Sequence, residues 1–222
     1  MRLFIYSAIA IPLLLADMLV VWAAPGLVTR FYSCQELFSV GGGVVVYLGF
    51  HVFIRKPERL YLWGHELTHL VIAKLFLRTV HGFHITSRDG GRVVIDGTNV
   101  WIDLAPYLFP FYGLLLMLAC TLLRPAPPWG TTAYLVGGGF LLGMHLLFSL
   151  EGFRQGQPDL LRSGRLFSFA LFLLFLAAWI PLVFAPGTPG GWGRIESIYL
   201  AWGKAALETG NDLFLSFRAF RF

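Results

Sequence analysis

The sequence contains little charge and few cysteines. Charged residues make up 13% of the 222 residues, whereas a typical soluble domain has about a quarter. Hydrophobic residues make up 57% of the chain, and the mean hydropathy is +0.70. This balance excludes an ordinary soluble enzyme and indicates a membrane protein that crosses the bilayer several times. The two cysteines, Cys34 and Cys120, have neither metal-ligand nor disulfide spacing, so we interpret both as small buried hydrophobic residues.

The net charge of +5 does not require a nucleic-acid partner. Basic residues that flank membrane spans explain it more simply. The expected partners are therefore the lipid bilayer and membrane proteins that serve as substrate or partner, with no nucleic acid. Once several spans are counted, 222 residues leave no room for a large additional domain, so we expect one membrane-embedded domain over residues 1–222.

Six apolar stretches approach the length of about 20 residues that a bilayer span needs. They are Leu3–Ala24, Leu37–Ile54, Leu60–Leu77, Trp101–Leu123, Thr131–Leu150 and Leu166–Phe184. Arg2 before the first stretch also fits a signal peptide, but the length, Asp17 and the missing Ala-x-Ala site favour a retained helix. Pro106 and Pro110 should kink the fourth span or leave backbone carbonyls free. We predict an all-α polytopic membrane protein with about six transmembrane helices.

A pentapeptide in the third stretch, His65-Glu66-Leu67-Thr68-His69, carries the strongest chemical signal. Positions i and i+4 lie on one face of a helix, so both imidazoles can bind one metal ion. Neutral imidazoles suit Zn²⁺, and two of them leave room for a third ligand and a water. Glu66 can reach that water as a general base. The pattern predicts a hydrolytic zinc site at membrane depth.

Two segments outside the spans have patterns of their own. Val80–Thr86 and Arg92–Ile95 are rich in β-branched and aromatic residues, and Asp89-Gly90 between them is a turn signal, so we predict a β-hairpin. Beside a protease site its edge can pair with an extended substrate, although the pattern alone favours a plain surface hairpin. Residues 192–222 predict an amphipathic interfacial tail helix, broken near Gly210.

The sequence offers several candidates for a third metal ligand, which a catalytic zinc usually has. They are Glu151, Asp159, Asp103, Asp96, His81, His84 and His145. Asp159 lies between Pro158 and an apolar helix start, where a carboxylate needs compensation from the helix N-terminus or a metal. The residue types alone leave this choice open.

Other polar residues near the candidate site have simpler interpretations. Asn99 and Asp103 open the fourth span, where each either caps the helix or holds a substrate carbonyl or a motif histidine. His145, deep in the fifth span, is interpreted as a packing or supporting residue. Glu151 is interpreted as a solvated residue at a helix end.

The order of these features resembles a known family. A His65-Glu66-x-x-His69 helix, a hairpin, a proline-containing span and then an aspartate after further apolar sequence resemble the site-2 protease superfamily of intramembrane zinc metalloproteases, the M50 type. Leu104-Ala105-Pro106-Tyr107-x-x-Pro110 and Gln157-Pro158-Asp159-Leu160 are similar to patterns of small M50-like members. The resemblance implies a metallopeptidase core over residues 60–185, with two accessory spans in residues 1–59 and the tail at 192–222.

The resemblance implies His65, His69 and Asp159 as Zn²⁺ ligands and Glu66 as the catalytic base. Asn99 and Asp103 would then contact substrate. We therefore expect a zinc-dependent metalloendopeptidase that cleaves membrane-associated proteins, as a multi-pass protein of a bacterial cytoplasmic membrane. Family members carry glycine after the aspartate, whereas Leu160 follows here.

Two alternatives come from other classes of protein. One is a non-catalytic membrane scaffold or assembly factor that retains the metallopeptidase fold, although a scaffold has no use for Glu66. The other is an unrelated transporter-like protein, although the sequence lacks the repeated halves and paired broken helices typical of transporters.

Overall fold

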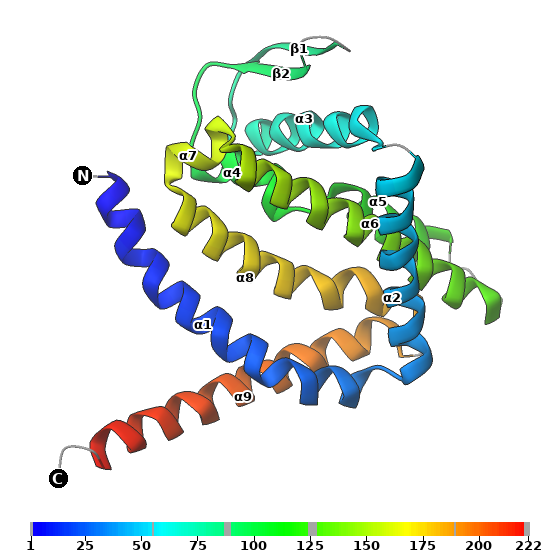
Figure 1. Cartoon of the computed structure of the whole chain (residues 1–222), viewed down its shortest axis with the longest axis vertical. Helices are drawn as coiled ribbons and strands as arrows, with labels where there is room; N and C mark the ends of the chain where they lie inside the picture. Colours follow the sequence, from blue (N-terminus) through cyan, green and yellow to red (C-terminus); the bar gives the residue numbers. More distant parts are fainter. Residues whose placement is uncertain (1, 55, 87–89, 124–127, 189, 220–222) are drawn as a thin grey trace.

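The computed structural model describes residues 2–54, 56–86, 90–123, 128–188 and 190–219, which are mainly helical (Figure 1). The helices are α1 (Arg2–Phe31), α2 (Cys34–Gly49), α3 (Glu58–Leu75), α4 (Val100–Leu108), α5 (Phe111–Leu123), α6 (Pro128–Gln155), α7 (Pro158–Ser163), α8 (Arg165–Phe184) and α9 (Gly191–Ala219). A π-helical turn, Phe50–Ile54, continues α2, and a 3₁₀ turn, Ala185–Gly187, follows α8. The two strands are β1 (Val80–Thr86) and β2 (Gly90–Ile95).

Within the described ranges, three helices are long and apolar enough to cross a membrane. They are Cys34–Ile54, Gly130–Gln155 and Arg165–Gly187, with a fourth span if α4 and α5 count as one. In the first predicted span, Leu3–Leu19 of α1 is also apolar. The third, α3, places Glu58, Arg59, Glu66 and Lys74 within 18 residues. The protein therefore has the helices of a membrane protein, but the count of six spans is not confirmed.

The predicted fourth span is a broken helix. Its two parts, α4 and α5, are bent by 68° at the break between Leu108 and Phe111. Pro110 lies at this break, where its missing N–H cannot continue the helix, as the sequence predicted. Pro106 lies inside α4, which stays helical around it.

Glycines allow α2 and α6 to pack with their backbones in contact. A Cβ atom on Gly43 would lie 2.1 Å from the Val136 carbonyl oxygen, and one on Gly139 would lie 2.1 Å from the Val40 carbonyl oxygen. Small residues permit this approach where apolar helices meet. α2 and α6 are therefore closely packed.

A hydrophobic core joins α1, α4, α7 and α8. Its buried members include Ala10 of α1, Leu104 and Tyr107 of α4, Leu160 of α7 and Phe172 of α8. Because Leu160 is fully buried beside α4, the short helix α7 is held at the end of the bundle that also carries α3. Figure 1 shows α3, α4, α7 and the hairpin together at this end, and α9 at the opposite end.

The β-hairpin is confirmed, and it lies over α3 (Figure 1). β1 and β2 pair antiparallel, with Phe83 opposite Val93, and β2 begins at Gly90 rather than at Arg92 as predicted. The predicted turn residues 87–89 lie outside the described ranges. Trp63 of α3 contacts the ring of Phe83 at a centroid distance of 5.5 Å, so apolar packing fixes the hairpin to the helix.

Several local predictions were wrong. α6 continues to Gln155, so Glu151 lies within a helix, and α9 runs unbroken past Gly210 to Ala219. Cys120 is buried as predicted, but Cys34 is exposed.

The start of α9 is fixed to α2, because the Arg194 guanidinium donates to the Glu36 carboxylate at 2.8 Å.

Candidate metal centre

The motif histidines lie on the buried face of α3. Gly64, His65, Thr68, His69 and Ala73 are all buried, at the spacing of one helical face that packs against α4. A Cβ atom on residue 64 would lie 2.7 Å from the ring of Tyr112, so glycine allows α5 to approach this face. His65 and His69 therefore point into the protein, with exposed fractions of 8% and 9%.

Asp159 meets both histidines from α7. Its Oδ2 atom lies 3.4 Å from His69 Nε2 and 3.9 Å from His65 Nε2. The ligand atoms of the three residues all lie within 4.8 Å of one another, and within the described residues no other group of this kind occurs. Bonds of about 2.1 Å to a tetrahedral zinc place two ligand atoms about 3.4 Å apart. The spacing therefore fits a metal ion held between the three side chains.

The second nitrogen of each imidazole has its own partner. His69 Nδ1 lies 2.7 Å from the Ile102 carbonyl oxygen, and His65 Nδ1 lies 3.4 Å from the Tyr61 hydroxyl. A carbonyl only accepts, so Nδ1 of His69 carries a proton, and Nε2, which faces Asp159, is the nitrogen left for a metal ion. Such outer contacts orient metal-binding histidines. Tyr61 is itself fixed by stacking on Phe148 at 4.2 Å.

An arginine and a second aspartate support Asp159. Arg162, one helical turn further along α7, lies 3.8 Å from Asp159 Oδ1 and donates to Asp103 Oδ1 at 2.9 Å. The Thr98 hydroxyl donates to the same Asp103 oxygen at 2.5 Å. Burial acts to raise the pKa of the Asp159 carboxyl, but its contacts with the two imidazoles outweigh burial and hold that pKa well below its usual range. Asp159 is therefore a carboxylate, as a metal ligand must be.

Glu66 borders a polar cavity of about 490 Å³ that also opens onto His65, His69 and Asp159. β2 forms one wall of this cavity, from Gly91 to Ile95. The backbone of Val93 hydrogen-bonds to the Glu66 carboxylate. A Cβ atom on Gly91 would lie 2.4 Å from Glu66 Cγ, so the strand lies directly against the predicted base.

The predicted substrate-contacting residues have different positions. Asp103 lines the cavity, where Arg162 and Thr98 hold its carboxylate. Asn99 is the N-cap of α4: its side-chain oxygen accepts from the Ile102 N–H at 2.9 Å, and it is not one of the residues that line the cavity.

The remaining candidates for the third ligand lie elsewhere. Glu151, interpreted from sequence as solvated, is partly buried; it pairs with Lys56 and lies 3.4 Å from His51 Nε2. Asp96 accepts from the Thr79 N–H at 3.2 Å at the base of the hairpin. His81 and His84 belong to β1, whose residues do not line the cavity.

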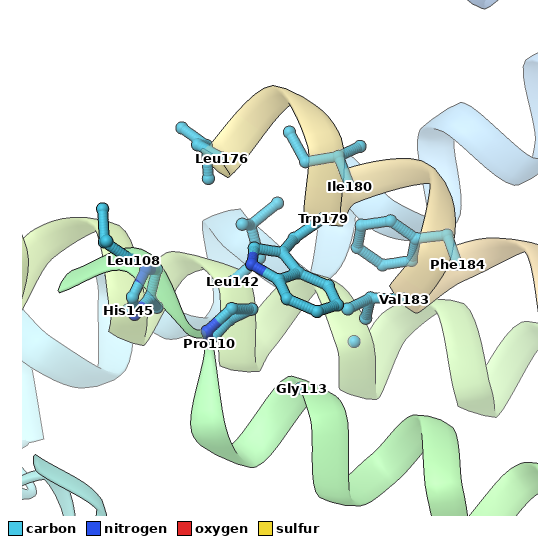
Figure 2. Close-up of a pocket in the computed structure, with 11 residues that line it drawn as sticks. Leu108, Pro110, Gly113, Leu142, His145, Leu176, Trp179, Ile180, Val183 and Phe184 are labelled. Atoms are coloured by element: carbon cyan, nitrogen blue, oxygen red, sulfur yellow. The ribbon is translucent and has the colours of Figure 1, made fainter. Parts of the chain in front are cut away.

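His145 is buried in the middle of the bundle, as predicted for a packing residue, and it hydrogen-bonds to the backbone of Tyr107. It borders a small apolar cavity beside the α4–α5 break (Figure 2).

The sequence interpretation missed Tyr61 and Arg162. Tyr61 precedes His65 by four residues, and Arg162 follows Asp159 by three, so helical spacing was the signal available for both. Searches against family models, curated proteins and solved structures found no match for this chain.

Proposed function

We propose that the protein is a membrane-embedded zinc metalloendopeptidase of the site-2 protease type, which hydrolyses peptide bonds of membrane-associated proteins. One observation carries the proposal. His65 and His69 from α3 and Asp159 from α7 direct three ligand atoms to one point at the edge of the cavity that Glu66 also borders.

The donor set favours zinc over other common ions. Two imidazoles and one carboxylate suit Zn²⁺, whereas Mg²⁺ and Ca²⁺ prefer oxygen ligands alone. Three protein ligands leave the open position that distinguishes catalytic zinc from structural zinc. When bound, the metal would polarise the scissile carbonyl and acidify a water.

Glu66 supplies the proton transfers of the reaction. Its carboxylate takes a proton from the attacking water, whose oxygen forms a bond to the scissile carbonyl carbon. The carbon–nitrogen bond then breaks, and Glu66 returns the proton to the leaving amine. Burial of Glu66, at 7% exposure, keeps competing bulk water away from the carboxylate.

The cavity and its strand suit an extended peptide. A volume of about 490 Å³ lies within the range of about 300–1,000 Å³ that is usual for ligand sites. β2 pairs with β1 on one side only, so its other edge faces the site and offers backbone groups to an extended substrate. The three or four apolar helices support a substrate that is itself in or at the membrane.

Glu66→Gln tests the proposal in the purified full chain. We expect an unchanged zinc content by metal analysis and a loss of cleavage of about 10²–10⁴-fold, because the general base is removed. The activity is measured on single-span test proteins reconstituted with the enzyme in liposomes. Glu58→Gln, an exposed residue of the same helix, is the matched control and should cleave like wild type.

If Glu66→Gln cleaves as well as wild type, the peptidase proposal is wrong. A zinc-bound protein that neither cleaves nor changes with this substitution supports the scaffold alternative. Comparing membrane proteomes of cells that express wild type or Glu66→Gln then identifies natural substrates, as proteins whose intact form accumulates with the variant.

A further inference from the structure

The proline inside α4 leaves one backbone carbonyl without a helical partner. In an α-helix each carbonyl accepts from the N–H four residues later, and Pro106 has no N–H to give to Ile102. Bonds of the ladder are formed three positions to either side: the Asp103 N–H donates to the Asn99 carbonyl at 2.9 Å, and the Phe109 N–H donates to the Ala105 carbonyl at 2.9 Å. The missing bond at Ile102 therefore lies within a segment that is otherwise helical.

Ile102 is buried, with an exposed fraction of 1%, so its carbonyl cannot turn to water. A buried carbonyl without a partner costs about 1–3 kcal/mol. The imidazole of His69 fills the gap, because its Nδ1 lies 2.7 Å from the Ile102 oxygen. His69 and Pro106, which are 37 residues apart in the sequence, thus act on the same carbonyl group, that of Ile102.

This hydrogen bond determines which His69 nitrogen faces the site. With Nδ1–H held by the Ile102 carbonyl, Nε2 is turned towards Asp159 Oδ2, 3.4 Å away. An N–H at position 106 would compete for the same carbonyl oxygen and would weaken the contact that orients the imidazole.

We propose that Pro106 is a positioning residue for the metal centre: by withholding an N–H, it reserves the Ile102 carbonyl for His69 Nδ1–H and so turns His69 Nε2 towards the site. The metal in this statement rests on the proposed function, whereas the hydrogen bond between His69 and Ile102 does not.

A comparison within the chain separates this role from ordinary packing. Pro181 is also buried inside a helix, but its helix, α8, contributes no ligand to the site. If Pro106 serves only to shape α4, replacing either proline should affect folding alone. If Pro106 acts through the Ile102 carbonyl, replacing Pro106 should weaken the hydrogen bond of His69, and replacing Pro181 should not.

The test measures the His69 Nδ1–H hydrogen bond in the metal-free full chain. The protein is labelled with ¹⁵N-histidine in lipid nanodiscs, and the His69 signals are assigned by comparison with His69→Gln. In wild type we expect Nδ1 to carry a proton that is hydrogen-bonded to the Ile102 carbonyl. In Pro106→Ala we expect this hydrogen bond to weaken, seen as a shift of the Nδ1 signal, and the zinc affinity, measured by competition with a chelator, to fall about tenfold. Pro181→Ala should match wild type in both measurements.

A second variant separates the missing N–H from the rigid ring. Replacing Pro106 by lactic acid, introduced by nonsense suppression, gives an ester that has neither the ring nor an N–H. We expect this variant to keep the wild-type hydrogen bond of His69 and the wild-type zinc affinity even if Pro106→Ala fails to fold. The proposal is overturned if Pro106→Ala keeps both properties, or if the lactic-acid variant loses them.

The outcome is independent of the peptidase test. The hydrogen bond is read without metal and the affinity without substrate, so an inactive protein still answers the question. If wild type shows the expected hydrogen bond but binds no zinc, the proposed function fails while the effect of Pro106 on His69 stands.

Discussion

The two halves of the broken helix, α4 and α5, border cavities of different size and polarity. α4 borders the polar cavity of about 490 Å³ where His65, His69 and Asp159 meet. The break at Pro110 borders two small cavities of about 10 and 20 Å³, and the one drawn in Figure 2 is lined mainly by apolar side chains. Both regions contain a buried histidine, so burial of a histidine does not by itself distinguish them.

The two regions differ in the groups that surround each histidine. His145 shares its apolar cavity with the indole of Trp179, whose N–H has no partner among the described residues (Figure 2). No carboxylate lines either small cavity. His69, in contrast, has a carboxylate at one nitrogen and a carbonyl at the other. A convergent carboxylate and open space, rather than the buried imidazole, therefore distinguish the candidate metal centre.

The largest effect should come from removing that carboxylate. Asp159→Ala should weaken zinc binding by more than about 100-fold, beyond the loss typical of a supporting residue, because one of three ligands is gone. Competition with a chelator measures the affinity. Glu151→Gln is the control, since Glu151 also lies beside a histidine, at 3.4 Å, yet has no role in the cavity. A variant without Asp159 that binds zinc like wild type would refute the ligand assignment.

A substitution on the apolar side should affect the fold and not the site. Gly139→Ala places a methyl group 2.1 Å from the Val40 carbonyl oxygen, a backbone atom that cannot move aside. We expect a loss of about 1–3 kcal/mol in the free energy of unfolding, measured by denaturation in detergent micelles. Gly137→Ala should be neutral, since the nearest atom is 3.9 Å away, on a Leu116 side chain. Zinc affinity of the folded fraction should stay unchanged, and a parallel loss would contradict the separation of the two regions.

Arg162 should have an intermediate effect at the polar end. Arg162→Met removes the cation that holds Asp103 at 2.9 Å and lies 3.8 Å from Asp159, so the ligand loses its orientation. Zinc affinity should fall about tenfold, the lower end of the range for supporting residues. Arg154→Met, at an exposed arginine of α6, should match wild type. An unchanged affinity in Arg162→Met would show that α7 alone orients Asp159.

The smallest effect should follow from Tyr61→Phe. The hydroxyl lies 3.4 Å from His65 Nδ1, a long contact worth about 0.5 kcal/mol, which corresponds to a change of about twofold in zinc affinity. Tyr112→Phe is the matched control. The Tyr112 hydroxyl donates to the Leu60 carbonyl of α3, the helix that carries Tyr61, and it contacts none of the proposed ligands. A loss as large as that of Arg162→Met would mean that His65 depends on its outer contact as strongly as Asp159 does.

The sequence predicted well what depends on short-range spacing. Four residues between His65 and His69 suffice to place both on one helical face, and the turn signal at Asp89-Gly90 suffices for a hairpin. Pro110 predicted a break, but its 68° bend depends on what packs around it. α9 continues through Gly210 because one glycine costs about 1 kcal/mol, which its neighbours in a long helix outweigh.

Long-range features were less accessible. The residues alone could not select Asp159 among the carboxylates, because its approach to His69 depends on the burial of Leu160 between helices distant in sequence. The number of spans, predicted from hydrophobicity, is not confirmed. α3 carries charges at both ends, at Glu58, Arg59 and Lys74.

The contact between Gly91 and Glu66 has a consequence for how the sequence tolerates change. Position 91 has ordinary backbone angles, so any small residue is compatible with the strand itself. What a larger residue disturbs is the Glu66 side chain, whose Cγ lies 2.4 Å and whose Oε1 lies 2.7 Å from that Cβ. Replacements there should therefore yield proteins that fold, insert and retain metal, and yet turn over slowly. In a saturation screen, position 91 would be strict under selection for activity and permissive under selection for expression.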